Sequence, residues 1–278
     1  MSELRFTKMH GAGNDFLVMD VPADGALPDS EQWRRLADRR SGVGFDQALV
    51  LGPAQVNGSA AHYRIFNADG GEVEQCGNGA RCIAHYLRLR GRGGADGTLS
   101  IDGTGGVVMA RPLDDGRYAV DLGVPNFEPA SLPFQAQATE ATYTLSIAGE
   151  KLEFGAVSIG NPHAVLRVTE IESAEVERIG SALQNHPSFP RRVNVGFMQI
   201  IDASHIRLRV FERGAGETKA CGTGACAAVA VGRNLGVLGS DVEVHVPGGR
   251  LGVHWEGAGQ HIWLAGPAVV AYTGLADI

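Results

Sequence analysis

The sequence predicts an α+β fold of two pseudo-symmetric domains, each a curved, mostly antiparallel, barrel-like sheet around a central helix. Three observations predict this fold. A cysteine-containing motif occurs twice, each copy is followed by a helical apolar pattern, and most of the remaining chain reads as short strands. We expect the active site to lie in the cleft between the two domains, where both motif copies can reach one ligand.

The internal repeat is the strongest of these signals. Residues 66–80, FNADGGEVEQCGNGA, align without gaps with residues 211–225, FERGAGETKACGTGA, and seven of the fifteen positions are identical. Cys76 and Cys221 occupy the same column of this alignment. Because the chain contains only four cysteines, a chance match between glycine-rich segments does not account for the alignment. Two copies of one structural unit are therefore predicted.

Secondary-structure patterns are similar in the two halves. Apolar residues recur at helical spacing over 80–87, and 225–231 is apolar on all sides, so a buried helix is predicted after each motif cysteine. Alternating or β-branched apolar segments bounded by Gly, Pro, Asp or Asn predict strands. The predicted strands are Tyr63–Asn67, Val107–Arg111, Tyr118–Leu122, Tyr143–Ile147, Val195–Ile201, Ile206–Phe211, Val242–Val246 and His261–Leu264.

Two proline-containing segments mark the expected domain boundaries. Val124–Phe127 begins a Pro- and Ala-rich linker, and Gly266–Pro267 interrupts the last part of the chain. We expect residues 1–122 with 267–278 to form the N-terminal half and residues 123–266 the C-terminal half. The last predicted strand, Val269–Tyr272, then returns to the first half.

Composition and charge exclude several classes of protein. A hydrophobic content of 44% with 20% charged residues is that of a globular chain, and the net charge of -7 argues against a nucleic-acid partner. The arginines of Arg34–Arg40 read as a solvated helix face. No apolar run approaches the roughly 18 residues of a membrane span. The first residues lack the apolar core of a signal peptide, so we expect a cytoplasmic protein without a membrane partner.

The cysteines do not read as a disulfide or zinc framework. Thiols stay reduced in the cytoplasm, and the spacings of Cys76 to Cys82 and Cys221 to Cys226 differ from the C-x2-C pairs of structural zinc sites. No metal is expected. Cys82 and Cys226 fall inside the predicted helices, as small buried apolar residues do. The glycines at 103–106 lack the spacing of a nucleotide-binding loop, so no cofactor motif is present.

A cysteine at a helix N-terminus suggests acid–base chemistry. The helix end favours a thiolate, so Cys76 and Cys221 are each candidate bases. Glycines at 77, 79, 222 and 224 let backbone N–H groups approach a carboxylate closely. One thiolate would remove the proton next to that carboxylate, and the opposite thiol would donate one to the other face. The pattern therefore predicts inversion at an α-carbon. A hydrolase, with one nucleophile and a separate base, does not need this symmetry.

Polar residues beside the motifs are candidate ligand contacts. Asparagine is also a common turn former, but four asparagines lie in symmetric or motif-adjacent loops. Glu212–Arg213 reads either as a surface ion pair or as a site for an ammonium and a carboxylate group. His163 reads either as a core histidine or as part of the site. The four asparagines are Asn14, Asn67, Asn161 and Asn194.

The chain resembles the diaminopimelate epimerases at these residues, in the same order along nearly the whole chain. The cysteine motifs are shared with proline racemase-like enzymes, and the asparagines with His163, Glu212 and Arg213 narrow the resemblance to this family. The matching segments are KMHGAGNDF at 8–16, GFDQ at 44–47, the block 66–82, GNPH at 160–163, FPRRVNV at 189–195 and the block 211–227.

The resemblance implies a cofactor-independent isomerase that interconverts LL- and meso-diaminopimelate in lysine and peptidoglycan precursor synthesis. Cys76 and Cys221 are then the acid and base, and His163 with Glu212 supports the reacting centre. Homodimerisation is also implied, with Tyr272 in the interface. The implied substrate contacts are Gly77–Asn78 and Gly222–Thr223 at the reacting carboxylate, Asn67, Asn161, Asn194 and Arg213 at the distal end, and Asn14 and Gln47 elsewhere in the pocket.

Two alternatives remain open at the level of sequence. One is a racemase for a smaller substrate such as proline or hydroxyproline. Arg213 and the asparagines argue against it, because they favour a ligand with a second charged end. The other is a thiol redox or metal-binding protein that uses the same cysteines.

Overall fold

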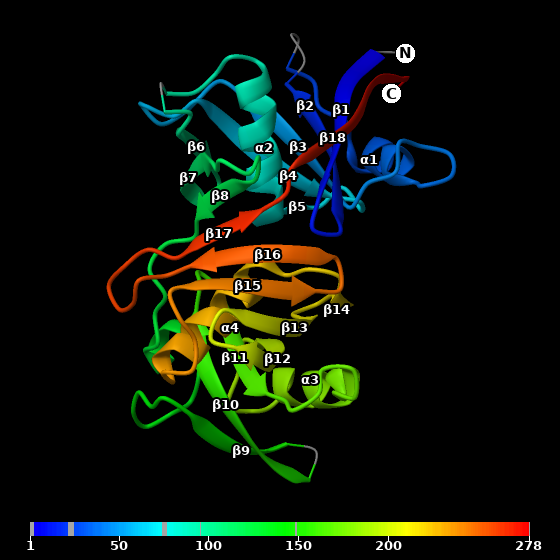
Figure 1. The fold of residues 1–278 in the computed structure, drawn as a ribbon. Helices are drawn as coiled ribbons and strands as arrows, with labels where there is room; N and C mark the ends of the chain where they lie inside the picture. The colour runs from blue at the N-terminus through cyan, green and yellow to red at the C-terminus, as the bar shows by residue number, and fades with distance from the viewer. Residues whose placement is uncertain (1–2, 22–24, 74–76, 95, 148, 278) are drawn as a thin grey trace. The chain divides into compact units, whose positions relative to one another are not determined.

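The computed structural model describes residues 3–21, 25–73, 77–94, 96–147 and 149–277. The chain forms two compact units: unit 1 comprises Met1–Val120 and Gly266–Ile278, and unit 2 comprises Asp121–Ala265. The two ends of the chain therefore belong to the same unit, as Figure 1 shows.

The sheet of unit 1 has the strand order β18-β1-β2-β3-β4-β6-β7-β8, with the short β5 paired to β4. The pairs β2–β3 and β4–β6 are parallel, and the others are antiparallel. Its strands are β1 (Glu3–Gly11), β2 (Asn14–Asp20), β3 (Gln47–Gly52), β4 (Ala61–Asn67), β5 (Glu72–Val73), β6 (Leu99–Gly103), β7 (Gly106–Pro112), β8 (Tyr118–Asp121) and β18 (Val269–Asp277).

The sheet of unit 2 repeats this order as β9-β10-β11-β12-β13-β15-β16-β17, with β14 paired to β13. Its parallel pairs, β11–β12 and β13–β15, correspond to those of unit 1. Its strands are β9 (Tyr143–Ile147), β10 (Glu150–Ser158), β11 (Pro162–Arg167), β12 (Asn194–Asp202), β13 (His205–Glu212), β14 (Gly216–Thr218), β15 (Asp241–Val246), β16 (Gly249–His254) and β17 (Trp263–Gly266).

Each sheet curves around one buried helix, as predicted. In unit 1, α2 (Gly77–Leu89) contacts β1, β2 and β7; in unit 2, α4 (Gly222–Asn234) contacts five strands, β10 to β13 and β16. All residues of α4 from Gly224 to Gly232 are buried. A side chain at Gly155 of β10 would come within 2.4 Å of Val231, so glycine allows the strand to approach the helix. The mostly antiparallel α+β architecture is confirmed.

Two further helices and a short 3-10 turn complete the fold. The amphipathic α1 (Ser30–Ala37) belongs to unit 1, and α3 (Val176–Gln184) packs against β9, β12 and β13 in unit 2. The 3-10 turn spans Pro129–Ser131. The reading of Arg34–Arg40 as a solvated helix face is only partly correct, because α1 ends at Ala37 and turns Trp33 and Leu36 into the core.

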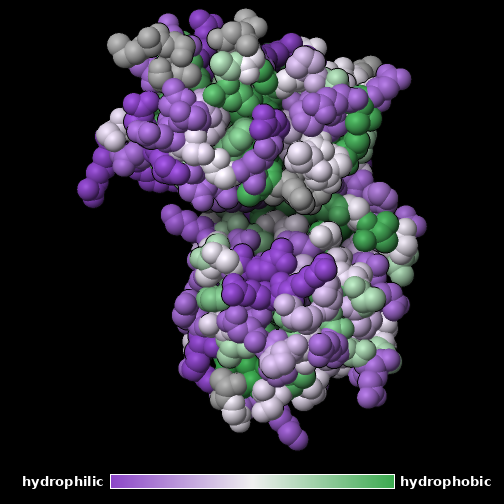
Figure 2. Space-filling model, turned by 180° about the vertical axis from the view of Figure 1, so that it is seen from behind, coloured by the Kyte–Doolittle hydropathy of each residue, from purple (hydrophilic) through white to green (hydrophobic). Residues whose placement is uncertain are grey.

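All of the predicted strands overlap observed ones, and the final strand pairs with β1. The least accurate is His261–Leu264, because the observed strand begins at Trp263. Figure 2 shows hydrophilic residues over most of the visible face and hydrophobic ones in smaller, separate areas. Within the described part of the chain, no helix is both long and apolar enough to cross a membrane.

Candidate functional site

The candidate residues of unit 1 come from the starts of β2 and β3, the end of β4 and the first turn of α2. Gln47 is the register partner of Asn67, and its side-chain amide donates a hydrogen bond of 3.0 Å to the Asn67 carbonyl oxygen. Asn78 donates to the side-chain oxygen of Asn14. Cys76, the proposed acid–base residue of this half, lies outside the described residues, and α2 begins at the next residue, Gly77.

Two residues that sequence reasoning missed fix the amides of Asn14 and Asn78. Asp46 accepts a hydrogen bond of 3.3 Å from the Asn14 amide, and Arg81 donates one of 2.7 Å to the Asn78 carbonyl oxygen. Arg81 is fully buried. Because an amide has one donor end and one acceptor end, these contacts fix the orientation of both amide groups.

The candidate residues of unit 2 come from the equivalent elements. His163 and Asn194 are register partners in the parallel pair β11–β12. The His163 Nε2 atom lies 2.9 Å from the Asn161 side-chain oxygen, and the Asn161 amide donates to the Thr223 hydroxyl at 3.3 Å. The side-chain oxygen of Asn194 accepts a hydrogen bond of 2.9 Å from the backbone N–H of Arg213. Asn161 therefore links His163 to Thr223 in the first turn of α4.

Cys221 is the N-cap residue of α4, in extended conformation, as the sequence predicted. Its sulfur lies 3.6 Å from the Thr223 hydroxyl oxygen. The helix end acts on Cys221 in the expected direction, since the Gly224 N–H lowers the pKa of the thiol, but two larger effects outweigh it. Burial raises the pKa of its thiol well above the usual value, and the neighbouring Glu212 carboxylate raises it further. Hydrogen bonds from Thr223 and the Gly224 N–H lower the pKa, but less. Cys221 is therefore a protonated thiol, suited to donate a proton.

His163 is neutral in this site. Burial lowers its pKa to about 3, and the positive charge of Arg213 acts in the same direction. Because Nε2 faces the carbonyl oxygen of Asn161, the ring proton lies on Nε2 and donates there. The other ring nitrogen, Nδ1, is buried and has no hydrogen-bond partner within the described residues. With its pKa lowered to about 3, the ring stays neutral and carries no charge in the site.

The remaining cysteines are structural. Cys82 and Cys226 are fully buried within α2 and α4, as predicted for small apolar residues. Cys82, Cys221 and Cys226 are free thiols. Over the described ranges, no group of His, Cys, Asp and Glu side chains is arranged to hold a metal ion.

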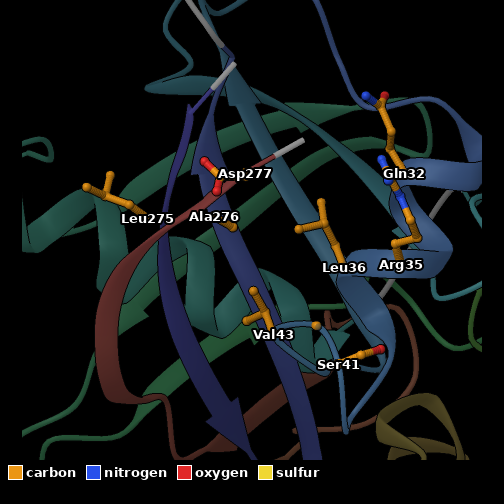
Figure 3. Close-up of a pocket in the computed structure, with 9 residues that line it drawn as sticks. Gln32, Arg35, Leu36, Ser41, Val43, Leu275, Ala276 and Asp277 are labelled. Carbon is orange, nitrogen blue, oxygen red and sulfur yellow. The ribbon is translucent and has the colours of Figure 1, made fainter. Parts of the chain in front are cut away.

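A cavity of about 450 Å³ in unit 1 does not involve these residues. It lies between α1 and the end of β18, with Leu36, Val43 and Ala276 among its lining residues and Arg35 and Asp277 beside them (Figure 3). No reactive thiol or histidine lines it. The chemistry of the sequence motifs is therefore carried by the helix ends and not by this cavity.

Thr218 is the most informative residue that sequence reasoning missed. Its hydroxyl donates a hydrogen bond of 2.5 Å to the Glu212 carboxylate. The signal was present in the repeat: Glu212 and Thr218 align with Asn67 and Val73, so both partners change together between the halves.

Comparison with known proteins assigns the family. The family model for diaminopimelate epimerase matches residues 6–128 and 155–271. A diaminopimelate epimerase from Alkalilimnicola ehrlichii is 51% identical over 273 residues, covering 98% of both chains.

Two solved structures show the same fold at low sequence identity. One is a phenazine biosynthesis protein of the PhzF family from Bacillus anthracis, with a TM-score of 0.68, 18% identity and coverage of 100% of both chains. The other is a hydroxyproline epimerase from Agrobacterium vitis, with a TM-score of 0.67, 16% identity and coverage of 99% of this chain and 92% of that one. By its sequence match over nearly its whole length, the chain belongs to the diaminopimelate epimerase family.

Proposed function

We propose that this protein interconverts LL- and meso-2,6-diaminopimelate by a two-base mechanism, without a cofactor, in lysine and peptidoglycan precursor synthesis. The observation that carries this proposal is the repeated cysteine at a helix N-terminus, within a chain of the diaminopimelate epimerase family. The thiols of Cys76 and Cys221 are the acid–base pair.

The reaction is redox-neutral. In one direction, the Cys76 thiolate takes the α-proton, and the electron pair of the broken C–H bond moves into the adjacent carboxylate. The Cys221 thiol then donates its proton to the opposite face of the same carbon, which inverts the centre. The protonated state of Cys221 supports its role as the donor in this direction. The roles exchange in the reverse reaction.

Backbone amides at the helix ends stabilise the charge that builds on the reacting carboxylate. We assign this role to Gly77–Asn78 at α2 and Gly222–Thr223 at α4, because a helix N-terminus presents unpaired N–H donors. We assign His163 and Glu212 to the support of the reacting centre: the imidazole of His163 is neutral, and the carboxylate of Glu212 raises the pKa of the Cys221 thiol.

The remaining polar residues recognise the distal end of the substrate. Arg213 supplies a cation for the second carboxylate, whereas Glu212, at the Cys221 end, supplies an anion for the ammonium group of the reacting centre. A proline-type substrate has no second charged end, so this set favours diaminopimelate. The amide side chains assigned to substrate binding are Asn14, Gln47, Asn67, Asn161 and Asn194.

A substrate panel tests the proposal. The purified protein is treated with a chelator and incubated separately with LL-diaminopimelate, L-proline and trans-4-hydroxy-L-proline, and the products are separated by chiral chromatography. We expect meso-diaminopimelate and no inversion of the other two. Inversion of proline or hydroxyproline in preference to diaminopimelate, or loss of activity to the chelator, would overturn the assignment.

We further propose a homodimer that uses β18. Among the described strands, β18 pairs only with β1, which leaves one edge unpaired. Val269, Tyr272 and Leu275 expose large apolar side chains along this strand, with Tyr272 48% exposed. Apolar residues on a free edge strand favour association. Sedimentation should show a dimer for the parent and a monomer for Tyr272→Asp; a monomeric parent would contradict this.

The proposed location is the cytoplasm. The free thiols of Cys82, Cys221 and Cys226 and the proposed need for two reduced catalytic cysteines suit a reducing compartment.

A further inference from the structure

The hairpin of β13 and β14 places a hydroxyl against a carboxylate next to the reactive thiol. Val210 and Thr218 are register partners, and so are Glu212 and Gly216. Residues two apart on a strand share a face, so Thr218 lies on the same face as Glu212. The hydroxyl of Thr218 donates to the Glu212 carboxylate at 2.5 Å, and both residues are partly buried.

The same carboxylate interacts with Cys221. Glu212 acts on the buried thiol through its negative charge and through a side-chain hydrogen bond. The carboxylate is therefore shared between the Thr218 hydroxyl and the Cys221 sulfur. A carboxylate with a fixed partner at one side has less freedom to turn away from the other.

The equivalent hairpin in unit 1 lacks this arrangement. Its register is the same, since Ile65 pairs with Val73 and Phe66 pairs with Glu72. Asn67 stands at the position of Glu212 and accepts a hydrogen bond from the Gln47 side chain. Val73 stands at the position of Thr218 and has no hydroxyl group. The hydroxyl and the carboxylate thus change together, which indicates that they act as a pair.

We propose that Thr218 is a positioning residue for Cys221: its hydroxyl holds the Glu212 carboxylate against the Cys221 thiol and so keeps that thiol protonated. This inference rests on the proposed role of Cys221 in the reaction. The Thr223 hydroxyl and the Gly224 N–H, both in the first turn of α4, act on the thiol in the opposite sense.

Two other polar residues of unit 2 adjoin this pair. Arg213, next to Glu212 on the same segment, carries a positive charge that acts on His163. His163, on β11, is neutral at physiological pH because burial lowers its pKa to about 3. The charge of His163 therefore does not change over the pH range in which the Cys221 thiol is titrated.

The test compares Thr218→Val with Thr218→Ser. Valine keeps the shape of threonine but removes the donor, whereas serine keeps the donor. The thiolate absorbance of each protein is titrated against pH, and the same titration of a matched Cys221→Ala protein is subtracted. In the valine variant, the Glu212 carboxylate turns away or becomes protonated, and either change lowers the pKa of the thiol.

We expect the pKa of Cys221 to fall by about one unit in Thr218→Val, a tenfold change in the thiolate ratio, and to stay at the parent value in Thr218→Ser. In a Glu212→Gln background, where the carboxylate charge is already absent, Thr218→Val should produce no further fall. With diaminopimelate, kcat should fall by about tenfold in Thr218→Val with little change in KM, because proton transfer and not binding is affected.

A Cys221 pKa that is unchanged in Thr218→Val, or that falls equally in Thr218→Ser, would overturn the inference. Thr218→Ala replaces the valine variant if the latter does not fold. The titration needs no substrate, so its result does not depend on the proposed epimerase activity. Failure of that activity would appear in the parent protein in the substrate panel.

Discussion

The hairpin β4–β5 in unit 1 and the hairpin β13–β14 in unit 2 share a register and an ion pair but differ in the polar residues next to the helix ends. Arg64 contacts Glu72 through two hydrogen bonds of 2.8 Å, and Arg209 contacts Glu217 in the same way at 2.7 and 2.8 Å. These residues occupy equivalent positions in the repeat. The repeated part of the hairpin is therefore its scaffold.

The unrepeated part sets the chemistry of each half. Unit 2 has Glu212, Thr218 and His163 where unit 1 has Asn67, Val73 and Phe16. Only the unit 2 set includes a carboxylate and an imidazole. Duplication therefore provides two similar helix ends, and in unit 2 the substitution to Glu212 adds to the burial that raises the pKa of Cys221.

Replacing the cysteines tests whether the two halves share one reaction and has the largest expected effect. Cys76→Ser and Cys221→Ser should each lower kcat by about a hundredfold to ten-thousandfold, because a hydroxyl is a much weaker acid than a thiol. Epimerisation of LL-diaminopimelate measures this effect.

The other cysteines provide the matched controls. Cys82→Ala and Cys226→Ala, at fully buried positions inside the helices, should keep kcat near the parent value per folded molecule. Near-full activity of either serine variant would show that its half is not needed for proton transfer.

Replacing His163 with phenylalanine, the residue of the other half, tests whether the buried imidazole makes stability depend on pH. The folded-state pKa of His163 is about 3, against an ordinary value of 6.5, so only the unfolded chain takes up this proton between these pH values. Its contribution to stability is present above pH 6.5 and is lost as the pH falls toward 3. His163→Phe should therefore remove about 1.4 kcal/mol per pH unit from the acid slope of stability.

Urea unfolding between pH 7 and pH 4.5 measures that slope. His10→Ala, at an exposed position, is the matched control and should leave the slope unchanged. An equal acid slope in His163→Phe and the parent would show that His163 does not carry this dependence.

The repeated ion pair predicts the smallest effect. Arg64→Met should cost at most about 1 kcal/mol, because its pair with Glu72 is partly exposed. Arg209→Met should cost about 1 kcal/mol more, because Arg209 also donates to the backbone carbonyls of Ile171 and Ala174. Urea unfolding of the two variants gives the comparison, and equal losses would contradict it.

Much of the fold was predictable because the repeat and the alternating strands are local signals. Tyr143–Ile147 alternates between exposed and less exposed positions and was found with its observed bounds. Nine of the described strands were missed: β1, β2, β3, β5, β6, β10, β11, β14 and β16. In β3 and β11, the residues that point to either face of the sheet are mostly buried, so their sequences do not alternate. Such a run does not distinguish a strand from a buried helix. α3 was missed because Gly180 interrupts it and no side chain caps its start.

The site was predictable in its positions but not in its electrostatics. The repeat located Cys221 at a helix end, which the structure confirms. Its raised pKa depends on burial by the surrounding sheet and on the approach of Glu212 across a hairpin. Neither quantity is a property of the local sequence, so the sequence predicted the effect of the helix end on the thiol but not the larger effects that raise its pKa.

The most direct test of the two-base account is the fate of the α-proton in deuterated water. With LL-diaminopimelate at low conversion, the account predicts meso product that carries solvent deuterium at the inverted carbon, while the remaining substrate stays almost unlabelled. Product that retains the original hydrogen, or substrate that gains deuterium as fast as product forms, would show that a single base serves both faces and would contradict the account.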